Sequence, residues 1–344
     1  MSDFPSIIKQ LLSTKSDTGR AVLATLVAVA GSSYRRPGAR LLVTAAGQRL
    51  GSISGGCLEE DILARAHSVA TTGQPELVIY DTSSENDLVW GVGLGCHGIV
   101  QVLLEPIPSP APDWIHTLDA QLTARRPTPL AVTWSSTDPA HPLGTRLAPS
   151  LQSAANPTPS TPPLTTAVFL ETITPSPSLI IFGAGDDAQP LAQLAHTLDW
   201  LVTIADPRAT FATSARFPTA DRLIIAPSTQ LIARVAPEPD AFAVVMTHHY
   251  VHDLPILRDL LSCNLPYIGL LGPKKRATRI LSDLQRDGFV PTAAQLARFH
   301  APIGLDLGAE TPAEVALSIL AEIRAQRSGR DARPLRERDR PIHD

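Results

Sequence analysis

The sequence predicts a two-domain α/β protein, in which a mixed α/β domain precedes a domain with a doubly wound parallel sheet. Its 344 residues are the usual length of two domains, and 44% hydrophobic residues suffice for two cores. The second half alternates short apolar runs with amphipathic stretches, which is typical of parallel strands joined by helices. Prolines cluster at 106–112 and 149–177. We therefore place the domains at 1–174 and 175–330, followed by a polar tail at 331–344.

The first domain mixes strand and helix patterns. We predict strands at 24–30, 130–134 and 167–171, because these runs are short and apolar. Apolar residues at helical spacing predict helices at 58–66 and 114–124. The proline-rich segments 106–112 and 148–165 are predicted loops, since proline breaks helices and central strands.

The second domain is predicted to be Rossmann-like, because buried strands alternate there with helices. The predicted strands are 178–182, 201–205, 223–225, 242–246 and 267–271, with a helix at 189–198. The first strand ends in a Gly-x-Gly-x-x-Ala turn that contains Gly183 and Gly185, and Asp206 closes the second strand. This context is typical of dinucleotide binding. The alternative is a turn kept only for packing, since Asp186 and Asp187 place negative charge where a pyrophosphate would lie.

Composition and charge exclude several classes. A net charge of −4 argues against nucleic-acid binding. The amino terminus lacks a signal-peptide pattern, and the longest apolar run, 21–30, is too short to cross a membrane, so we expect a cytoplasmic protein. Three cysteines are too few for a disulfide scaffold, and we expect reduced thiols.

Two of the three cysteines lie in glycine-rich turns. Cys57 follows Gly55 and Gly56, and Cys96 follows Gly95. Glycines leave a thiol accessible, and the amides at the start of the helix expected at 58–66 would favour a Cys57 thiolate, the form that binds metal or sulfur. The alternative is a small buried cysteine beside a tight turn. Cys263 is assigned to the apolar helical run at 256–261 and is predicted to lie in the core.

A basic loop follows the strand at 24–30. It combines glycines with two serines and three arginines: Ser32, Ser33, Arg35, Arg36 and Arg40. Hydroxyls, glycine amides and guanidinium groups together suit a phosphate or another oxyanion. The alternative is a solvated basic turn.

A histidine-rich run follows the strand at 242–246. His248, His249 and His252 precede Asp253 at the carboxyl edge of the predicted sheet, where such sheets bind ligands. These side chains suit metal binding or acid-base chemistry, and His248 is the candidate ligand. The alternative is a solvated loop that caps the next helix.

These motifs resemble the XdhC/CoxI family of accessory proteins for xanthine dehydrogenase and related molybdenum hydroxylases. The resemblance covers nearly the whole chain and rests on the segments 31–38, 51–59, 93–96, 182–185, 247–248, 272–276 and 300–312. Two positions depart from the family pattern: His97 stands where glycine is usual, and Asp186 where histidine is usual.

The resemblance implies a molybdenum cofactor chaperone, not an enzyme, whose first domain binds the molybdopterin form of the cofactor. Such a protein protects the cofactor, presents it to a cysteine desulfurase for sulfuration, and inserts it into an apo-hydroxylase of the xanthine dehydrogenase type. It would also meet cofactor biosynthesis proteins and form a homodimer. The hypothesis is that Cys57 and Cys96 meet the metal or its dithiolene, while the serines and arginines of the basic loop hold the phosphate and pterin.

Two alternatives from other classes stay open. One is an NAD(P)-dependent oxidoreductase that uses Gly183, Gly185 and Asp206 for the nucleotide and a histidine as proton carrier. The other is a thiol redox protein that cycles a disulfide between Cys57 and Cys96, although the sequence has no Cys-x-x-Cys motif.

Overall fold

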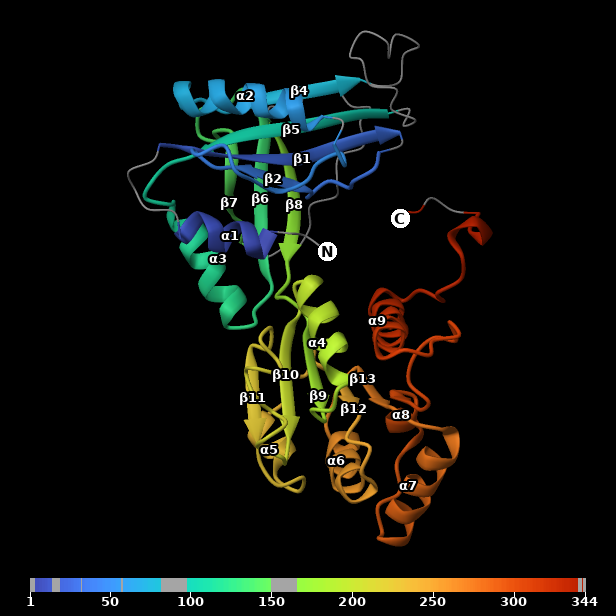
Figure 1. Cartoon of the computed structure of the whole chain (residues 1–344). Coiled ribbons are helices and arrows are strands. Elements are labelled where there is room, and N and C mark those ends of the chain that lie inside the picture. Colours follow the sequence, from blue (N-terminus) through green and yellow to red (C-terminus); the bar gives the residue numbers. More distant parts are fainter. Residues whose placement is uncertain are drawn as a thin grey trace. The chain divides into compact units, whose positions relative to one another are not determined.

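A computed structural model describes residues 4–13, 19–31, 33–56, 58–81, 98–149, 166–339 and 342 of the chain (Figure 1). Contacts between residues divide the chain into two compact units, Met1–Pro175 and Ser176–Asp344. Each unit has its own hydrophobic clusters. In the described residues, no helix is long and apolar enough to cross a membrane.

The first unit is built around an antiparallel sheet in the order β3-β2-β1-β5-β4. Its strands are β1 (Ala21–Gly31), β2 (Arg40–Val43), β3 (Arg49–Gly51), β4 (Glu76–Asp81) and β5 (Gly98–Ile107). Helix α2 (Glu59–Thr72) covers one face through Ile62, Ala66 and Val69, which recur at helical spacing and are buried against this sheet. The helix ends at Gly73, a left-handed C-cap whose amide bonds to the Val69 carbonyl.

A smaller antiparallel sheet and two helices pack on the other face of this sheet (Figure 1). The elements are α1 (Phe4–Ser13), α3 (Asp113–Thr123), β6 (Thr128–Ser136), β7 (Gly144–Leu147) and β8 (Thr166–Ile173), with strand order β7-β6-β8. The mixed α/β prediction is confirmed for this unit. Helix α1 was not predicted, although Phe4, Ile7, Ile8 and Leu11 form a buried helical stripe.

The second unit contains a parallel sheet in the order β11-β10-β9-β12-β13-β14. Its strands are β9 (Ser178–Phe182), β10 (Leu201–Asp206), β11 (Arg222–Ile225), β12 (Phe242–Val245), β13 (Tyr267–Leu270) and β14 (Phe299–His300). Counted from β9, this order is 3-2-1-4-5-6, the doubly wound arrangement of dinucleotide-binding folds. The Rossmann-like prediction is confirmed, and β14, a two-residue strand, is an addition to it.

Helices cover both faces of this sheet. Along β9, Leu179 and Ile181 face the cluster that contains α4 and α9, whereas Ile180 and Phe182 face the cluster that contains α5, α6 and α7. These helices are α4 (Ala188–Thr197), α5 (Leu231–Val235), α6 (Tyr250–Ser262), α7 (Lys274–Arg286) and α9 (Pro312–Ser328). A short helix α8 (Ala293–Leu296) precedes β14, and a 3-10 turn η2 (Leu335–Glu337) lies in the tail.

Cys263 lies at the end of α6 and only partly fits its prediction. It follows the last helical residue, Ser262, and its side chain is half-buried against a hydrophobic cluster. Burial raises the pKa of the Cys263 thiol, which favours its neutral form.

Candidate functional site

The basic loop begins where β1 runs beyond β2. Gly31, the last residue of β1, is paired with Gly98, the first residue of β5. The loop then folds back on β1, because the Gly38 amide donates to the Leu26 carbonyl at 2.8 Å and the Leu26 amide donates to the Ala39 carbonyl at 2.9 Å. Gly98 follows the second glycine-rich turn in the sequence, and it borders the start of the basic loop at the end of β1.

The first glycine-rich turn also meets this loop. Gly55 has φ +81°, and a Cβ on Gly55 would lie 3.0 Å from Cε1 of Tyr34. The Tyr34 ring therefore lies against a residue that only glycine suits well. Tyr34 is nevertheless 65% exposed, so the ring packs on the turn from the surface. The sequence motifs alone assign Tyr34 no function.

Glu59 organises the turn that precedes α2. Its Oε1 accepts bonds from the Ser52 hydroxyl at 2.9 Å and from the amides of Ile53 and Ser54 at 3.1 and 2.9 Å. Its Oε2 accepts from the Ser54 hydroxyl and from the amides of Gly56 and Leu58, the last two at 2.9 and 3.2 Å. One carboxylate thus satisfies donors from five residues of the turn.

The environment of Glu59 favours its charged form. Burial opposes ionisation, but the hydrogen bonds from Ser54, Ser52 and Ile53 outweigh it and lower the pKa to about 2. The amides of Gly56 and Leu58, which flank position 57, therefore already donate hydrogen bonds to Glu59. These two amides are not free to stabilise a thiolate, whereas the thiolate at Cys57 itself stays a prediction, because residue 57 lies outside the described residues. The sequence motifs did not single out Glu59. The signal that could have identified it is its place as the first residue of a helix, directly after a serine- and glycine-rich turn.

The cationic and hydroxyl groups of the basic loop differ in exposure. Arg36 and Tyr34 are exposed, whereas Ser33 and Arg35 are half-buried. Among the described residues, Arg36 has no ion-pair partner. Arg36 is therefore the guanidinium of this loop that is most available to an anion.

Arg40 does not fit the predicted contact with a cofactor phosphate. It is the first residue of β2, is 2% exposed, and forms an ion pair with Glu171 of β8. Its guanidinium also lies over the Phe4 ring, with Cζ 3.8 Å from the centroid. Because β2 pairs with β1 opposite Thr25, the side chain points into the fold and joins β8 to the larger sheet. Arg40 is thus a structural ion-pair partner.

Four predicted site residues lie outside the described residues: Ser32, Cys57, Gly95 and Cys96. Their neighbours are described. Gly56 and Leu58 flank position 57, and Gly98 lies two residues after position 96. Gly56 is exposed with φ +127°, and a Cβ there would meet no atom within 4 Å. The glycine-rich turn is thus open to solvent at Gly56.

The second predicted site lies at the carboxyl edge of the parallel sheet, between β9 and β12. The strand order reverses at this point, where doubly wound sheets bind their ligands. Gly183 has φ +119°, and a Cβ there would lie 2.5 Å from the Met246 carbonyl oxygen. Close packing of the turn against the end of β12 therefore already requires this glycine.

Asp206 has no free oxygen for a ribose. The residue is fully buried at the end of β10. Its Oδ1 accepts from the Arg208 amide at 2.7 Å and Nε at 2.9 Å, and Oδ2 accepts from Arg208 at 2.8 Å and from the Ala184 amide at 2.7 Å. Burial opposes ionisation, but these bonds lower the pKa of Asp206. The acid that suggested nucleotide binding thus holds the turn to Arg208.

The two aspartates of the turn also have side-chain partners. Asp186 is exposed and pairs with Arg216 at 2.9 Å. Asp187 Oδ2 lies 2.6 Å from Nε2 of His248, which has φ +60°. The carboxylates therefore form bonds across the carboxyl edge of the sheet beside Gly185, where a Cβ would lie 2.6 Å from Asp187 Oδ1. A pyrophosphate at this turn would meet negative charge.

The histidine-rich run does not converge on one point. His248 faces Asp187, whereas the rings of His249 and His252 contact each other with centroids 5.8 Å apart. Asp253 is buried and forms an ion pair with Arg276. Within the described ranges, no group of three or more His, Cys, Asp or Glu side chains could hold a metal ion.

Comparisons with known proteins match both units. The family described as the XdhC and CoxI family matches residues 16–81, and the XdhC Rossmann domain matches residues 179–323. A protein of Bacillus subtilis (strain 168) that is described as a probable xanthine dehydrogenase subunit is 40% identical over 334 residues, which cover 94% of this chain and 97% of that protein.

Two further relatives are similar over most of the chain. The molybdenum cofactor insertion chaperone PaoD of Escherichia coli (strain K12) is 26% identical over 89% of this chain and 83% of its own length. A crystal structure described as a xanthine dehydrogenase from Bacillus halodurans has a TM-score of 0.80 and 31% identity, over 97% of this chain and 99% of that one. The chain belongs to the XdhC and CoxI family.

Proposed function

We propose that this protein is a maturation factor for a molybdenum hydroxylase of the xanthine dehydrogenase type, with the molybdenum cofactor as its cargo. It binds and protects the cofactor, presents it to a cysteine desulfurase for sulfuration, and inserts it into the apo-hydroxylase. Two relatives support this function, one described as a molybdenum cofactor insertion chaperone and the other as a probable xanthine dehydrogenase subunit.

The observation that carries the proposal is a pair of contacts that the basic loop makes with two glycines, Gly55 and Gly98. Gly31 pairs with Gly98, and Tyr34 packs on Gly55. Gly55, two residues before Cys57, and Gly98, two residues after Cys96, therefore border the same basic loop. A thiophilic metal and a phosphate on one ligand need thiols and cations from one neighbourhood, which these segments provide.

The residues present fit such a cargo. A Cβ on Gly56 would meet no atom within 4 Å, and Arg36 is an exposed guanidinium of the loop whose Tyr34 packs on Gly55. In the proposal, Cys57 and Cys96 contact the metal or its dithiolene, while Ser32, Ser33, Arg35 and Arg36 hold the phosphate and pterin. Gly55, Gly56 and Gly95 keep these turns free of side chains. Arg40 supports the loop from inside the fold.

The alternative function, an NAD(P)-dependent oxidoreductase, is supported less well by the geometry of the parallel-sheet unit. In that function Asp206 would bind the ribose, but its oxygens already accept hydrogen bonds from Arg208 and from the Ala184 amide. Close packing against the Met246 carbonyl already explains why Gly183 is a glycine, without a bound nucleotide.

The proposal also includes a cytoplasmic location and a homodimer.

The test is the molybdenum and pterin content of protein purified from a cofactor-producing host, by mass spectrometry and by fluorescence of the oxidised pterin. We expect near-stoichiometric pterin in the parent and its loss in the Cys57→Ala and Cys96→Ala variants. Cys263→Ala is the matched control, because Cys263 lies in the other unit and should keep the cargo. Bound nicotinamide nucleotide in place of pterin and molybdenum would overturn the proposal.

A further inference from the structure

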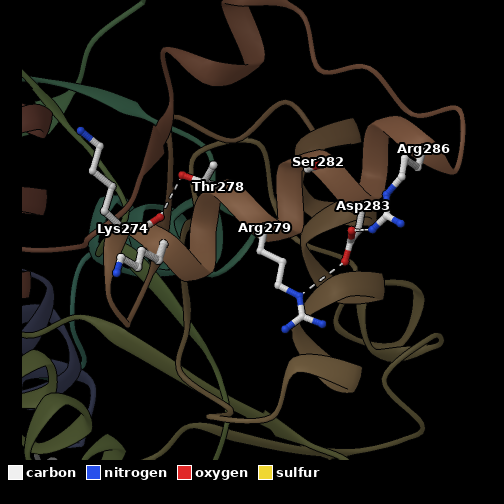
Figure 2. A pocket seen from close by; sticks show the side chains of 7 residues that line it. Lys274, Thr278, Arg279, Ser282, Asp283 and Arg286 are labelled. Carbon is white, nitrogen blue, oxygen red and sulfur yellow. Dashed lines mark hydrogen bonds and ion pairs between the residues drawn. The ribbon is translucent and has the colours of Figure 1, made fainter.

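The outer face of α7 carries a strongly basic pocket that the proposed function does not use. The pocket has a volume of about 780 Å³. The residues that line it, here called the basic face, are Lys274, Lys275, Thr278, Arg279, Ser282, Asp283 and Arg286. Figure 2 shows the labelled side chains of this set along one side of the helix. They recur three or four residues apart, the spacing that places side chains on one helical face.

The opposite side of α7 is anchored in the core. Ala277, Ile280 and Leu284 are buried in the cluster that packs on the parallel sheet. Burial of these three side chains fixes the rotation of the helix about its axis. The basic face is therefore a rigid surface that points away from the sheet.

A single carboxylate holds the two arginines of this face. The Asp283 carboxylate accepts a hydrogen bond from the Tyr250 hydroxyl and forms an ion pair with Arg286. Its Oδ2 lies 3.9 Å from Nε of Arg279. The Arg279 guanidinium also lies over the Tyr250 ring, with Cζ 4.7 Å from the centroid. These contacts restrict the arginines before any partner binds, which lowers the entropy cost of binding.

The two lysines of this face are exposed. Lys274 and Lys275 lie in the first turn of α7, and no carboxylate of the described residues forms an ion pair with either. Four cations against the single Asp283 carboxylate give the face a formal charge of +3 (4 − 1), although the whole chain carries −4. Positive charge is thus concentrated on one helix of an acidic protein.

We propose that the basic face of α7 is a docking surface for an acidic segment of a partner protein. The segment from Lys274 to Arg286 spans about 18 Å at a rise of about 1.5 Å per residue. This length matches about five or six residues of an extended acidic strand, or one face of an acidic helix. Charge complementarity of this kind accelerates association and selects among partners.

Other anions fit this face less well. One phosphate is satisfied by two or three donors and would leave the remaining cations unused. A single-stranded nucleic acid would find Tyr250 covered by Arg279 in place of an open aromatic ring for stacking. An acidic protein segment uses the whole face and needs no stacking ring.

The inference deepens the proposed function and rests on it in one respect, because a chaperone that delivers a cofactor must dock on proteins. The test uses a fluorescent peptide of six glutamates and measures its binding to the full chain by anisotropy. We expect binding that weakens with added salt, since exposed ion pairs are screened. The charge reversal Lys275→Glu with Arg279→Glu should weaken it at least tenfold, and the milder Lys274→Ala with Lys275→Ala at least threefold.

The matched control reverses two exposed arginines elsewhere in the same unit, Arg234→Glu on α5 and Arg324→Glu on α9. This variant has the same net charge as the first reversal and should bind the peptide as the parent does. Equal weakening in the control, or unchanged binding in both α7 variants, would overturn the inference.

Two competitors separate the other anions. The first competitor is inorganic phosphate, compared with sodium chloride of equal ionic strength. Displacement of the peptide by phosphate but not by sodium chloride would reassign the face to a small anion. A 12-base-pair DNA duplex that binds more tightly than the peptide, and loses binding in the same variants, would reassign it to nucleic acid. Pterin content of the α7 variants should equal that of the parent, so failure here is distinct from failure of the proposed function.

Discussion

The carboxylate of Glu59 accepts both the backbone amide and the hydroxyl of Ser54, which lies five residues earlier in the chain. The same carboxylate accepts the amides of Gly56 and Leu58. Residue 57 therefore lies between two residues that donate to one buried anion. The geometry of this turn depends on Glu59 more than on any helix cap, because the N-cap Leu58 makes no side-chain bond.

Replacing Glu59 with Gln should destabilise the protein. The Gln carboxamide keeps one acceptor oxygen, but its NH2 group would face amide donors that then lose their partners. We expect the free energy of unfolding to fall by about 1–3 kcal/mol, measured by urea titration. Glu60→Gln is the control, because Glu60 is exposed on the same helix turn and should change stability by less than about 0.5 kcal/mol. Equal effects of the two substitutions would contradict this account.

The stabilising contribution of Glu59 should depend on pH. Its pKa is about 2 in the folded protein against an ordinary 4.5, so between these values the unfolded chain binds more protons. The contribution is therefore fully present above about pH 4.5 and decreases as the pH falls toward 2. Asp61 and Asp206 also have lowered pKa values, so the parent alone does not isolate Glu59. The stability difference between the parent and Glu59→Gln should shrink from pH 6 to pH 3, and a constant difference would refute this prediction.

Arg36 and Arg40 should give opposite phenotypes. Arg36→Gln removes an exposed cation, so we expect unchanged stability and at least a tenfold loss of cofactor affinity, measured by pterin fluorescence. Arg40→Gln breaks a buried ion pair with Glu171 and should lower the unfolding free energy by about 3–5 kcal/mol. The comparison fails if Arg40→Gln folds as stably as the parent.

Nicotinamide nucleotides should not bind to the parallel-sheet unit. Asp206 is occupied by Arg208 and Ala184, and Asp187 adds negative charge at the turn. Isothermal titration with NAD and with NADP should show no saturable binding up to millimolar concentration. Saturable binding of either nucleotide would require Asp206 to release Arg208 and would restore the oxidoreductase alternative.

Much of the second unit was predictable because each strand is a continuous apolar run bounded by helical patterns. Such runs need burial on both faces, and a parallel sheet with helices on each side provides it. Strand β14 was missed because two residues carry no periodicity, and its pairing with β13 is supplied by tertiary contacts. Helix α1 was missed although Phe4, Ile7 and Ile8 have helical spacing.

The sequence by itself determined which residue types lie in each motif, because glycine, serine, arginine and cysteine gather at the loops that follow or join strands. The tertiary structure decided which of them face solvent. Arg36 and Arg40 are four residues apart in one basic segment, but Glu171 on β8, 131 residues later, draws Arg40 into the fold. Such a partner leaves no local trace in the sequence, because a buried charge is stabilised by a group that only the folded chain brings near.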